Sequence, residues 1–182
     1  MHLLGAIFFI VITMIPTVHG ATQENTLQHD WKQERENGEV RFISNYPAPF
    51  PFSTTGEPEA IMTIHVEKIS PDKKALAEIM QSEVEAIRKE IQITDYLEED
   101  GQTPDHGIAT YVEEINGQQV GFIKYRTTGL IGRPAVMPRT VIHAIVMKND
   151  RIYFVHLIVL FSEHQEEIRA DQITMIKGLI GR

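Results

Sequence analysis

The stretch from Val136 to Phe161 constrains the fold most, because it reads as two apolar strands joined by a short polar turn at residues 148–151. Apolar side chains occupy both faces of this pair, which is typical of strands covered on both sides. One face carries Val141, Ile145, Phe154 and Ile158, and the other carries Ile142, Val146, Tyr153, Val155 and Leu157. The turn sets Met147 opposite Ile152, Ile145 opposite Phe154, and His143 opposite His156. We therefore expect two central antiparallel strands with a covering layer on each side.

A second hairpin is predicted around Asn116-Gly117, the residue pair that a type I′ turn prefers. This turn sets Tyr111 opposite Phe122 and Ile108 opposite Tyr125. Aromatic pairs of this kind stabilise a sheet by about 0.2–1 kcal/mol each. The sequence thus fixes the register of two neighbouring hairpins.

The other elements follow from the spacing of apolar residues. Ser70-Pro71-Asp72 supplies a helix N-cap, a proline at the first helical position and an early acid. Ser162 and Gln165 have the spacing of a capping box. In chain order we expect strands at 39–45 and 60–68, a helix at 71–92, a strand at 92–98, the two hairpins, and a terminal helix.

Consecutive hairpins favour an α+β fold, with a mainly antiparallel sheet of about six to seven strands and two amphipathic helices packed on it. This order resembles the PsbP proteins of photosystem II and the related DcrB-like envelope proteins. The resemblance covers residues 39–180. It rests on the strand from Val40 into the Tyr46-Pro47 loop, the helix after the second strand, and the final hairpin followed by a helix. It implies an α/β/α sandwich in a non-enzymatic protein that binds other proteins or acts in assembly.

Residues 1–20 resemble a secretory signal peptide. The apolar run Leu3–Ile15 is shorter than the roughly 20 residues that span a membrane. Pro16 and the small-residue site before Ala21 follow it. We expect cleavage near Ala21 and a periplasmic or secreted protein without a stable membrane anchor, with an uncleaved anchor as the alternative. DcrB-like proteins are commonly lipoproteins, but this chain contains no cysteine to carry a lipid.

Residues 21–38 are polar, with Trp31 as the one large apolar residue after Leu27, and they are interpreted as a loose leader or a short helix. Residues 39–182 are interpreted as one domain. The absence of cysteine means that this exported domain is held by its core without disulfides, which suits a bacterial envelope.

Charge and motif content exclude several function classes. The net charge is −8, with Lys and Arg dispersed among more numerous carboxylates, so nucleic acid is not an expected partner. The chain has no Gly-x-Ser-x-Gly elbow and no cysteine nucleophile. The carboxylate runs at 98–100 and at Glu113-Glu114 read as solvated charge, since neighbouring strand residues point to opposite faces. We expect neither an enzyme nor a cofactor.

His143 and His156 form the sharpest candidate for metal binding, because the hairpin register places them about 5 Å apart on one face. Zinc needs three or four ligands, and His65 and Glu67 on another strand are the further candidates. The alternative is an ordinary cross-strand pair in which one ring bonds the other.

Two loops are candidates for partner binding. The loop after residue 45 is stiffened by proline and carries Tyr46, Phe50 and Phe52, which suit rigid anchors or a simple cover for the core. The loop at 129–139 carries Arg133 and Arg139, which suit an acidic partner or a plain connection. The leading hypothesis is an exported, non-enzymatic protein-binding domain, such as an assembly factor, inhibitor or immunity-type partner. The alternative is a periplasmic protein that binds a small ligand or a divalent metal.

Overall fold

The computed structural model describes residues 27–36, 39–49, 56–69, 75–94, 107–133, 137–160 and 162–181. Its elements are β1 (Trp31–Glu36), β2 (Glu39–Ser44), β3 (Ala60–Lys68), α1 (Leu76–Glu90), β4 (Ile91–Thr94), β5 (Ile108–Ile115), β6 (Gln118–Leu130), β7 (Arg139–Lys148), β8 (Arg151–Val159) and α2 (Gln165–Ile180). The predicted signal peptide and the residues Phe50 and Phe52 lie outside the described part. Within that part, no helix is long and apolar enough to cross a membrane.

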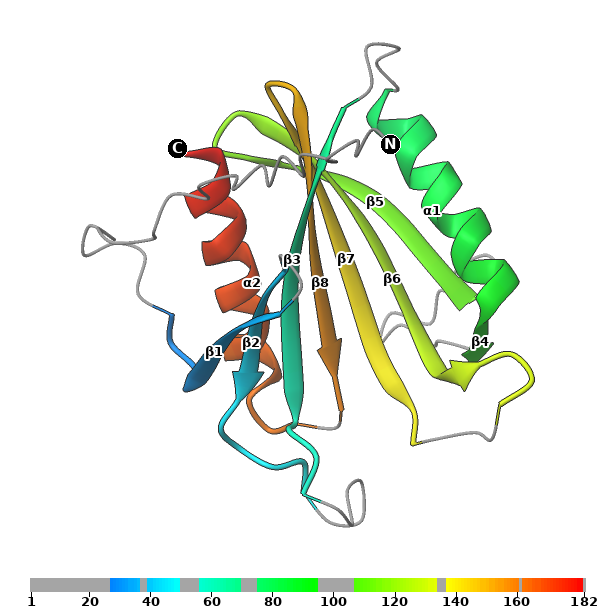
Figure 1. The fold of residues 1–182 in the computed structure, drawn as a ribbon, viewed down its shortest axis with the longest axis vertical. Helices are drawn as coiled ribbons and strands as arrows, with labels where there is room; N and C mark the ends of the chain where they lie inside the picture. The colour runs from blue at the N-terminus through cyan, green and yellow to red at the C-terminus, as the bar shows by residue number, and fades with distance from the viewer. Residues whose placement is uncertain are drawn as a thin grey trace, which may run out of the picture.

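The strands form one antiparallel sheet in the order β1-β2-β3-β8-β7-β6-β4, with β5 also paired to β6 (Figure 1). The α+β class is confirmed, and the sheet has eight strands where six to seven were expected. Both predicted registers are confirmed: Tyr111 pairs with Phe122, and His143 pairs with His156. Asn116 and Gly117 have positive φ angles of 50° and 76°, as a type I′ turn requires.

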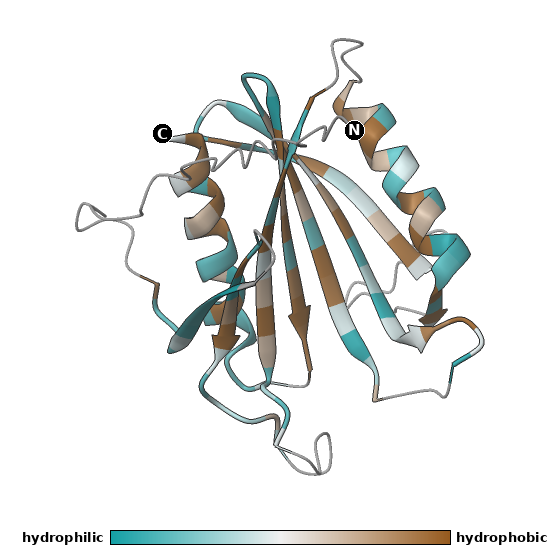
Figure 2. Ribbon diagram, viewed as in Figure 1, coloured by the Kyte–Doolittle hydropathy of each residue, from teal (hydrophilic) through white to brown (hydrophobic). Residues whose placement is uncertain are grey.

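The central strands are covered on both faces, as their two-sided apolar pattern predicted. On one face, Ile168 and Ile176 of α2 pack on a core that includes Val146 and Leu157. On the other, Ile79 and Ile87 of α1 join a core that includes Ile145. Figure 2 shows apolar bands along these strands between the two helices. The fold is therefore an α/β/α sandwich.

Two local contacts fix the helices to the sheet. A Cβ at Gly121 of β6 would lie 2.5 Å from Met80 Sδ, so glycine permits the close approach of α1. Lys148, beside the β7–β8 turn, donates from Nζ to the carbonyl oxygens of Leu179 at 3.2 Å and Ile180 at 2.7 Å. These carbonyls have no partner within the helix, so the lysine caps the end of α2.

The interpretation of residues 21–38 as a loose leader or short helix is wrong for Trp31–Glu36. These residues form β1, which pairs along its length with β2. Its polar composition is that of a sheet edge, where charged side chains prevent pairing with other chains. Because this edge strand carries few apolar residues, a search for apolar alternation does not find it.

The start of α2 also differs from the prediction. The helix begins at Gln165 with His164 as its N-cap, and no side chain caps it. Ser162 instead donates its hydroxyl proton to Glu59 and accepts the backbone N–H of His164. The capping-box prediction is therefore wrong, because a buried carboxylate takes up the serine hydroxyl. The other boundaries shift slightly: β4 begins at Ile91, and the cap predicted at 70–72 lies outside the described residues.

Candidate metal centre

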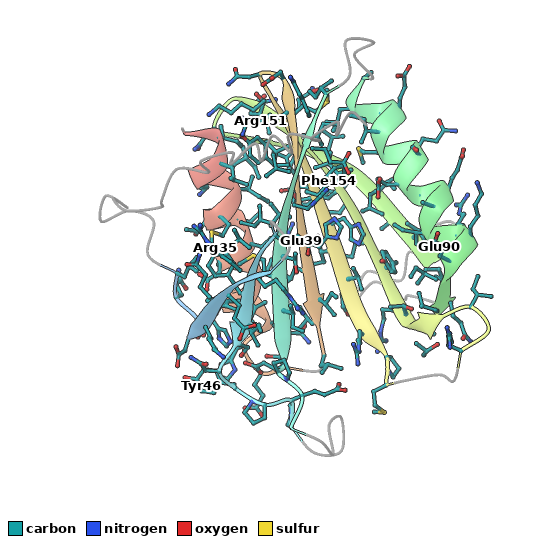
Figure 3. All side chains as sticks on the ribbon, viewed as in Figure 1. Arg35, Glu39, Tyr46, Glu90, Arg151 and Phe154 are labelled. Atoms are coloured by element: carbon teal, nitrogen blue, oxygen red, sulfur yellow. The ribbon has the colours of Figure 1, made fainter. Side chains whose placement is uncertain are left out.

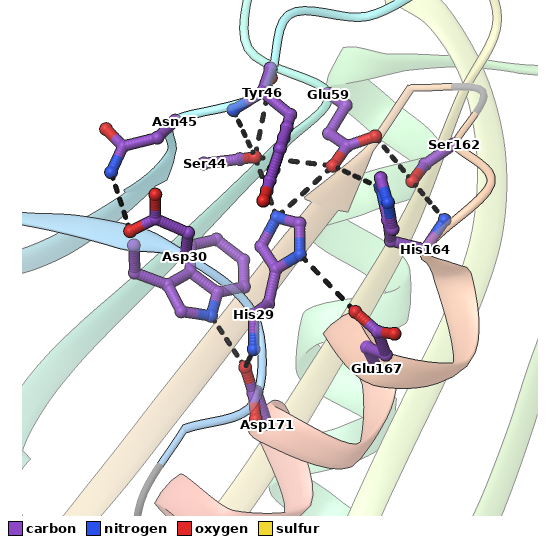
Figure 4. Close-up of polar contacts among 11 residues, drawn as sticks. His29, Asp30, Ser44, Asn45, Tyr46, Glu59, Ser162, His164, Glu167 and Asp171 are labelled. Atoms are coloured by element: carbon purple, nitrogen blue, oxygen red, sulfur yellow. Dashed lines mark hydrogen bonds and ion pairs between the residues drawn. The ribbon is translucent and has the colours of Figure 1, made fainter.

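A buried carboxylate, Glu59, lies where the chain enters β3 and is 2% exposed. Its Oε2 accepts the hydroxyl proton of Ser162 at 2.6 Å. Its Oε1 lies 3.0 Å from His164 Nδ1 and 3.2 Å from His29 Nε2 (Figure 4). An isolated carboxylate is costly to bury, so these contacts are what permit Glu59 to lie inside the fold.

His29 is positioned by the segment before β1, which is tied to α2 through Asp171. The carboxylate of Asp171 is fully buried and accepts three hydrogen bonds. The donors are the backbone N–H groups of Gln28 at 2.7 Å and His29 at 2.9 Å, and Nε1–H of Trp31 at 2.7 Å. Asp171 therefore fixes the backbone of His29, and this residue is 5% exposed.

His164 forms the open side of the cluster. Its backbone is fixed at the N-cap of α2, and its side chain remains 37% exposed. The ring of Tyr46 lies 5.0 Å from that of His164 and 5.2 Å from that of His29. Tyr46 is itself 45% exposed. The ring of Tyr46, which Figure 3 labels near the lower edge of the molecule, thus partly shields the cluster that Figure 4 shows in close-up.

Two distances in this cluster are close to those between neighbouring ligands of a small divalent ion. Zinc lies about 2.0–2.1 Å from histidine nitrogen and carboxylate oxygen, so neighbouring ligand atoms in a tetrahedron are roughly 3.3 Å apart. The two measured distances to Glu59 Oε1 are 3.2 and 3.0 Å. One ligand atom from each of His29, Glu59 and His164 lies within 4.8 Å of the others, the one such group among the described residues.

Two further groups, Glu167 and Ser162, lie beside His29 and Glu59. His29 Nδ1 is buried and has no hydrogen-bond partner among the described residues. The carboxylate oxygen Oε2 of Glu167 lies 4.0 Å from it. Histidine ligands commonly donate their second N–H to a carboxylate, and ligating carboxylates are themselves hydrogen-bonded. Ser162 has the second of these roles for Glu59, whereas Glu167 lies near His29 Nδ1 but beyond hydrogen-bond distance.

The predicted pair His143 and His156 is adjacent but is arranged differently from a metal site. Their rings stack with centroids 4.1 Å apart and planes 15° apart. Nitrogen lone pairs lie in the ring plane, so an ion shared by both rings would require one ring to rotate. His143 Nε2 lies 3.2 Å from the hydroxyl of Tyr125. Burial raises the pKa of Tyr125 to about 12, so that this hydroxyl keeps its proton to donate.

The stacked histidines are kept neutral by their surroundings. Burial lowers the pKa of His143 to about 3, with a further contribution from His156. The pKa of His156 is also lowered, mainly by burial and then by His65. Within the described part of the chain, His143 Nδ1 and His156 Nε2 are buried without a hydrogen-bond partner. The pair is therefore a buried polar site that protonation would disrupt.

The ring nitrogens of His65 face two carboxylates. His65 is paired with Phe154 across β3 and β8, and its ring nitrogens face Glu67 Oε1 at 3.2 Å and Glu39 Oε1 at 3.6 Å. This cluster is about half exposed. Metal binding by His65, His143 and His156 therefore stays a prediction. In the structure the rings of His143 and His156 stack on each other, and the ring of His65 faces two carboxylates.

The residues predicted for partner binding lie in two places. Arg139 Nη2 donates to Glu57 Oε2 at 3.1 Å, which joins the start of β7 to the loop that carries Tyr46. Arg133 instead borders a surface hollow together with Lys89 and Leu130. Glu113 and Glu114 are both exposed on β5, as their interpretation as solvated charge requires.

Sequence reasoning missed His29, Glu59 and His164 because they are separated by 30 and 105 residues and share no motif. His29 lies in the segment interpreted as a leader, and His164 in the supposed capping box. One signal was present. Trp31 is a large apolar residue in an otherwise polar segment, and its burial brings His29 to the body of the protein.

No protein-family profile matches this sequence, and no curated protein sequence matches it. Among solved structures, a Pseudomonas aeruginosa protein of unknown function, PA94, aligns at 11% identity and a TM-score of 0.45, over 80% of this chain and 93% of that one. Cyanobacterial PsbP from Synechocystis sp. PCC 6803 aligns at 10% identity and a TM-score of 0.41, over 86% of this chain and 94% of that one.

Proposed function

We propose that this chain is a non-enzymatic protein that binds one divalent transition-metal ion through His29, Glu59 and His164. The observation that carries the proposal is the convergence of two imidazole nitrogens on one buried carboxylate oxygen, at 3.2 and 3.0 Å. The three residues come from three separate parts of the chain, so an ion would link the segment before β1, the entry to β3 and the start of α2.

The ligand set indicates which ions would bind. Imidazole suits zinc and copper, whereas magnesium and calcium prefer sites made of oxygen ligands alone. In a site of nitrogen and oxygen ligands, copper(II) binds more tightly than zinc(II). Three protein ligands leave a fourth position for water or another small ligand. We expect affinity in the order copper, zinc and then magnesium.

Export, proposed from residues 1–20, is compatible with such a site. The chain has no cysteine, so the ligands contain no thiol that an oxidising compartment could convert to a disulfide. A site built from histidine and glutamate keeps its ligands under those conditions. The proposed setting is the bacterial periplasm or the extracellular medium.

Thermal unfolding of the chelator-treated protein tests metal binding. An ion at 100 times its dissociation constant adds about 2.7 kcal/mol to the free energy of unfolding, roughly 5–10 °C in Tm. We expect this rise with copper and zinc, and none with magnesium. His164→Ala should reduce it strongly, because His164 supplies one of three ligands. His65→Ala, which removes a half-exposed histidine from β3, should leave it intact. An unchanged rise in His164→Ala would contradict the proposal.

Protein binding is a second candidate function. It is favoured by the contact between Arg139 and Glu57. This contact joins the end of the predicted binding loop at 129–139 to the loop that carries Tyr46. Tyr46 is 45% exposed and could serve as an aromatic anchor. We expect Tyr46→Ala to reduce the capture of a partner from envelope extract, whereas Val112→Ala, at a residue 52% exposed on β5, should not. Equal capture by both variants would count against this surface.

A further inference from the structure

A second surface combines exposed aliphatic and basic side chains. It lies near the β4 edge of the sheet, whereas Tyr46 follows β2 near the β1 edge. Leu130 at the end of β6 is 50% exposed, and Ile131 in the following turn is 56% exposed. Figure 2 shows this connection as an apolar band where the chain leaves β6. The two side chains are adjacent in the chain and together expose aliphatic surface at one turn.

Basic residues surround these two side chains. Lys89, Glu90 and Arg133 border one shallow hollow beside Ile131. Arg88 borders the adjoining hollow, which Ile131 also lines. Arg88, Lys89 and Arg133 are exposed, so the residues that line the two hollows carry three cations and one carboxylate, Glu90, in a chain whose net charge is −8. Exposed Glu85 lies one helical turn before Arg88 and Lys89, whereas charges more than about 8 Å away are largely screened at physiological ionic strength.

We propose that Leu130, Ile131 and the cations Arg88, Lys89 and Arg133 form a peripheral docking surface for an anionic lipid membrane. Aliphatic residues that enter the headgroup region, beside Lys and Arg that meet anionic headgroups, are the features of an interfacial membrane contact. A protein partner would instead favour aromatic anchors in a formed pocket. Here the hollows are shallow and the anchors are aliphatic, so a lipid surface is the better match.

The chain lacks cysteine, which permits a local test on the full-length protein. A single cysteine introduced by Ile131→Cys carries an environment-sensitive fluorophore, and the matched control carries it at Val112→Cys on exposed β5. The probe is a vesicle of phosphatidylcholine with about 30 mol % phosphatidylglycerol. Because the readout is local, an apolar segment elsewhere that contacts lipid does not produce it.

We expect a blue shift and increased emission from the label at 131 with anionic vesicles, and no change at 112. Reversing two charges through Lys89→Glu and Arg133→Glu should weaken the vesicle affinity by about tenfold or more. High salt should have the same effect as charge reversal. The proposal is overturned if the label at 131 does not respond, if it responds like the label at 112, or if charge reversal has no effect.

Discussion

Replacing Asp171 with alanine should lower the free energy of unfolding by about 3–5 kcal/mol, the largest effect expected of a single substitution at this end of the fold. Asp171 is fully buried in α2 and accepts from Gln28 N–H, His29 N–H and Trp31 Nε1–H. Alanine would leave these donors without a partner and leave a cavity behind. Urea unfolding monitored by tryptophan fluorescence measures the loss, since Trp31 is the one tryptophan of the chain.

The matched control is Asp150→Ala in the β7–β8 turn, where the carboxylate is largely exposed. A surface substitution of this kind is expected to change stability by no more than about 0.5 kcal/mol. Because Asp171 also holds the backbone of His29, its loss should weaken metal binding as well. Equal stability of the two variants would show that the segment before β1 is not anchored through Asp171.

Acidification should destabilise the protein through the stacked pair His143 and His156. Burial lowers the pKa of His143 to about 3 from 6.5, and it also lowers the pKa of His156. Between pH 6.5 and 3 the unfolded chain therefore binds protons that the folded chain does not, so stability falls as the pH falls. The loss is about 1.4 kcal/mol per pH unit for each proton taken up on unfolding.

Urea titrations at several pH values between 3 and 7, with a chelator present, measure this slope. His143→Phe removes the most strongly shifted group while filling the same space beside Tyr125, so it should flatten the profile by about one proton. Val112→Ala, at an exposed residue of β5 that does not titrate, should leave the slope as it is. A profile that stays equally steep in His143→Phe would contradict this assignment.

The parts of the fold that could be predicted are those in which local chemistry and burial agree. The pair Asn116-Gly117 imposes a turn whose geometry sets the whole β5–β6 register. The two-sided apolar pattern of β7 and β8 places them at the centre of the sheet, and Ile168 and Ile176 mark the buried face of α2. Periodicity reports burial, so it finds the elements that are buried.

Polar elements and the candidate metal centre could not be found in this way. The strand β1 carries mostly charged residues because it lies at the edge of the sheet, and it therefore lacks an apolar alternation. Ser162 matches a capping motif, yet its hydroxyl binds Glu59. That contact exists only once β3 and α2 are in place. Contacts across 105 residues depend on the finished topology, which no local pattern records.

X-ray absorption at the zinc edge, on protein loaded with one equivalent of zinc, tests directly whether His29, Glu59 and His164 bind the ion. We expect nitrogen and oxygen ligands at about 2.0–2.1 Å from zinc, including two imidazoles in the native protein. We also expect one imidazole fewer in His164→Ala and the native spectrum in His143→Phe. A spectrum that is unchanged in His164→Ala, or that loses an imidazole in His143→Phe, would show that zinc binds elsewhere and contradict the account.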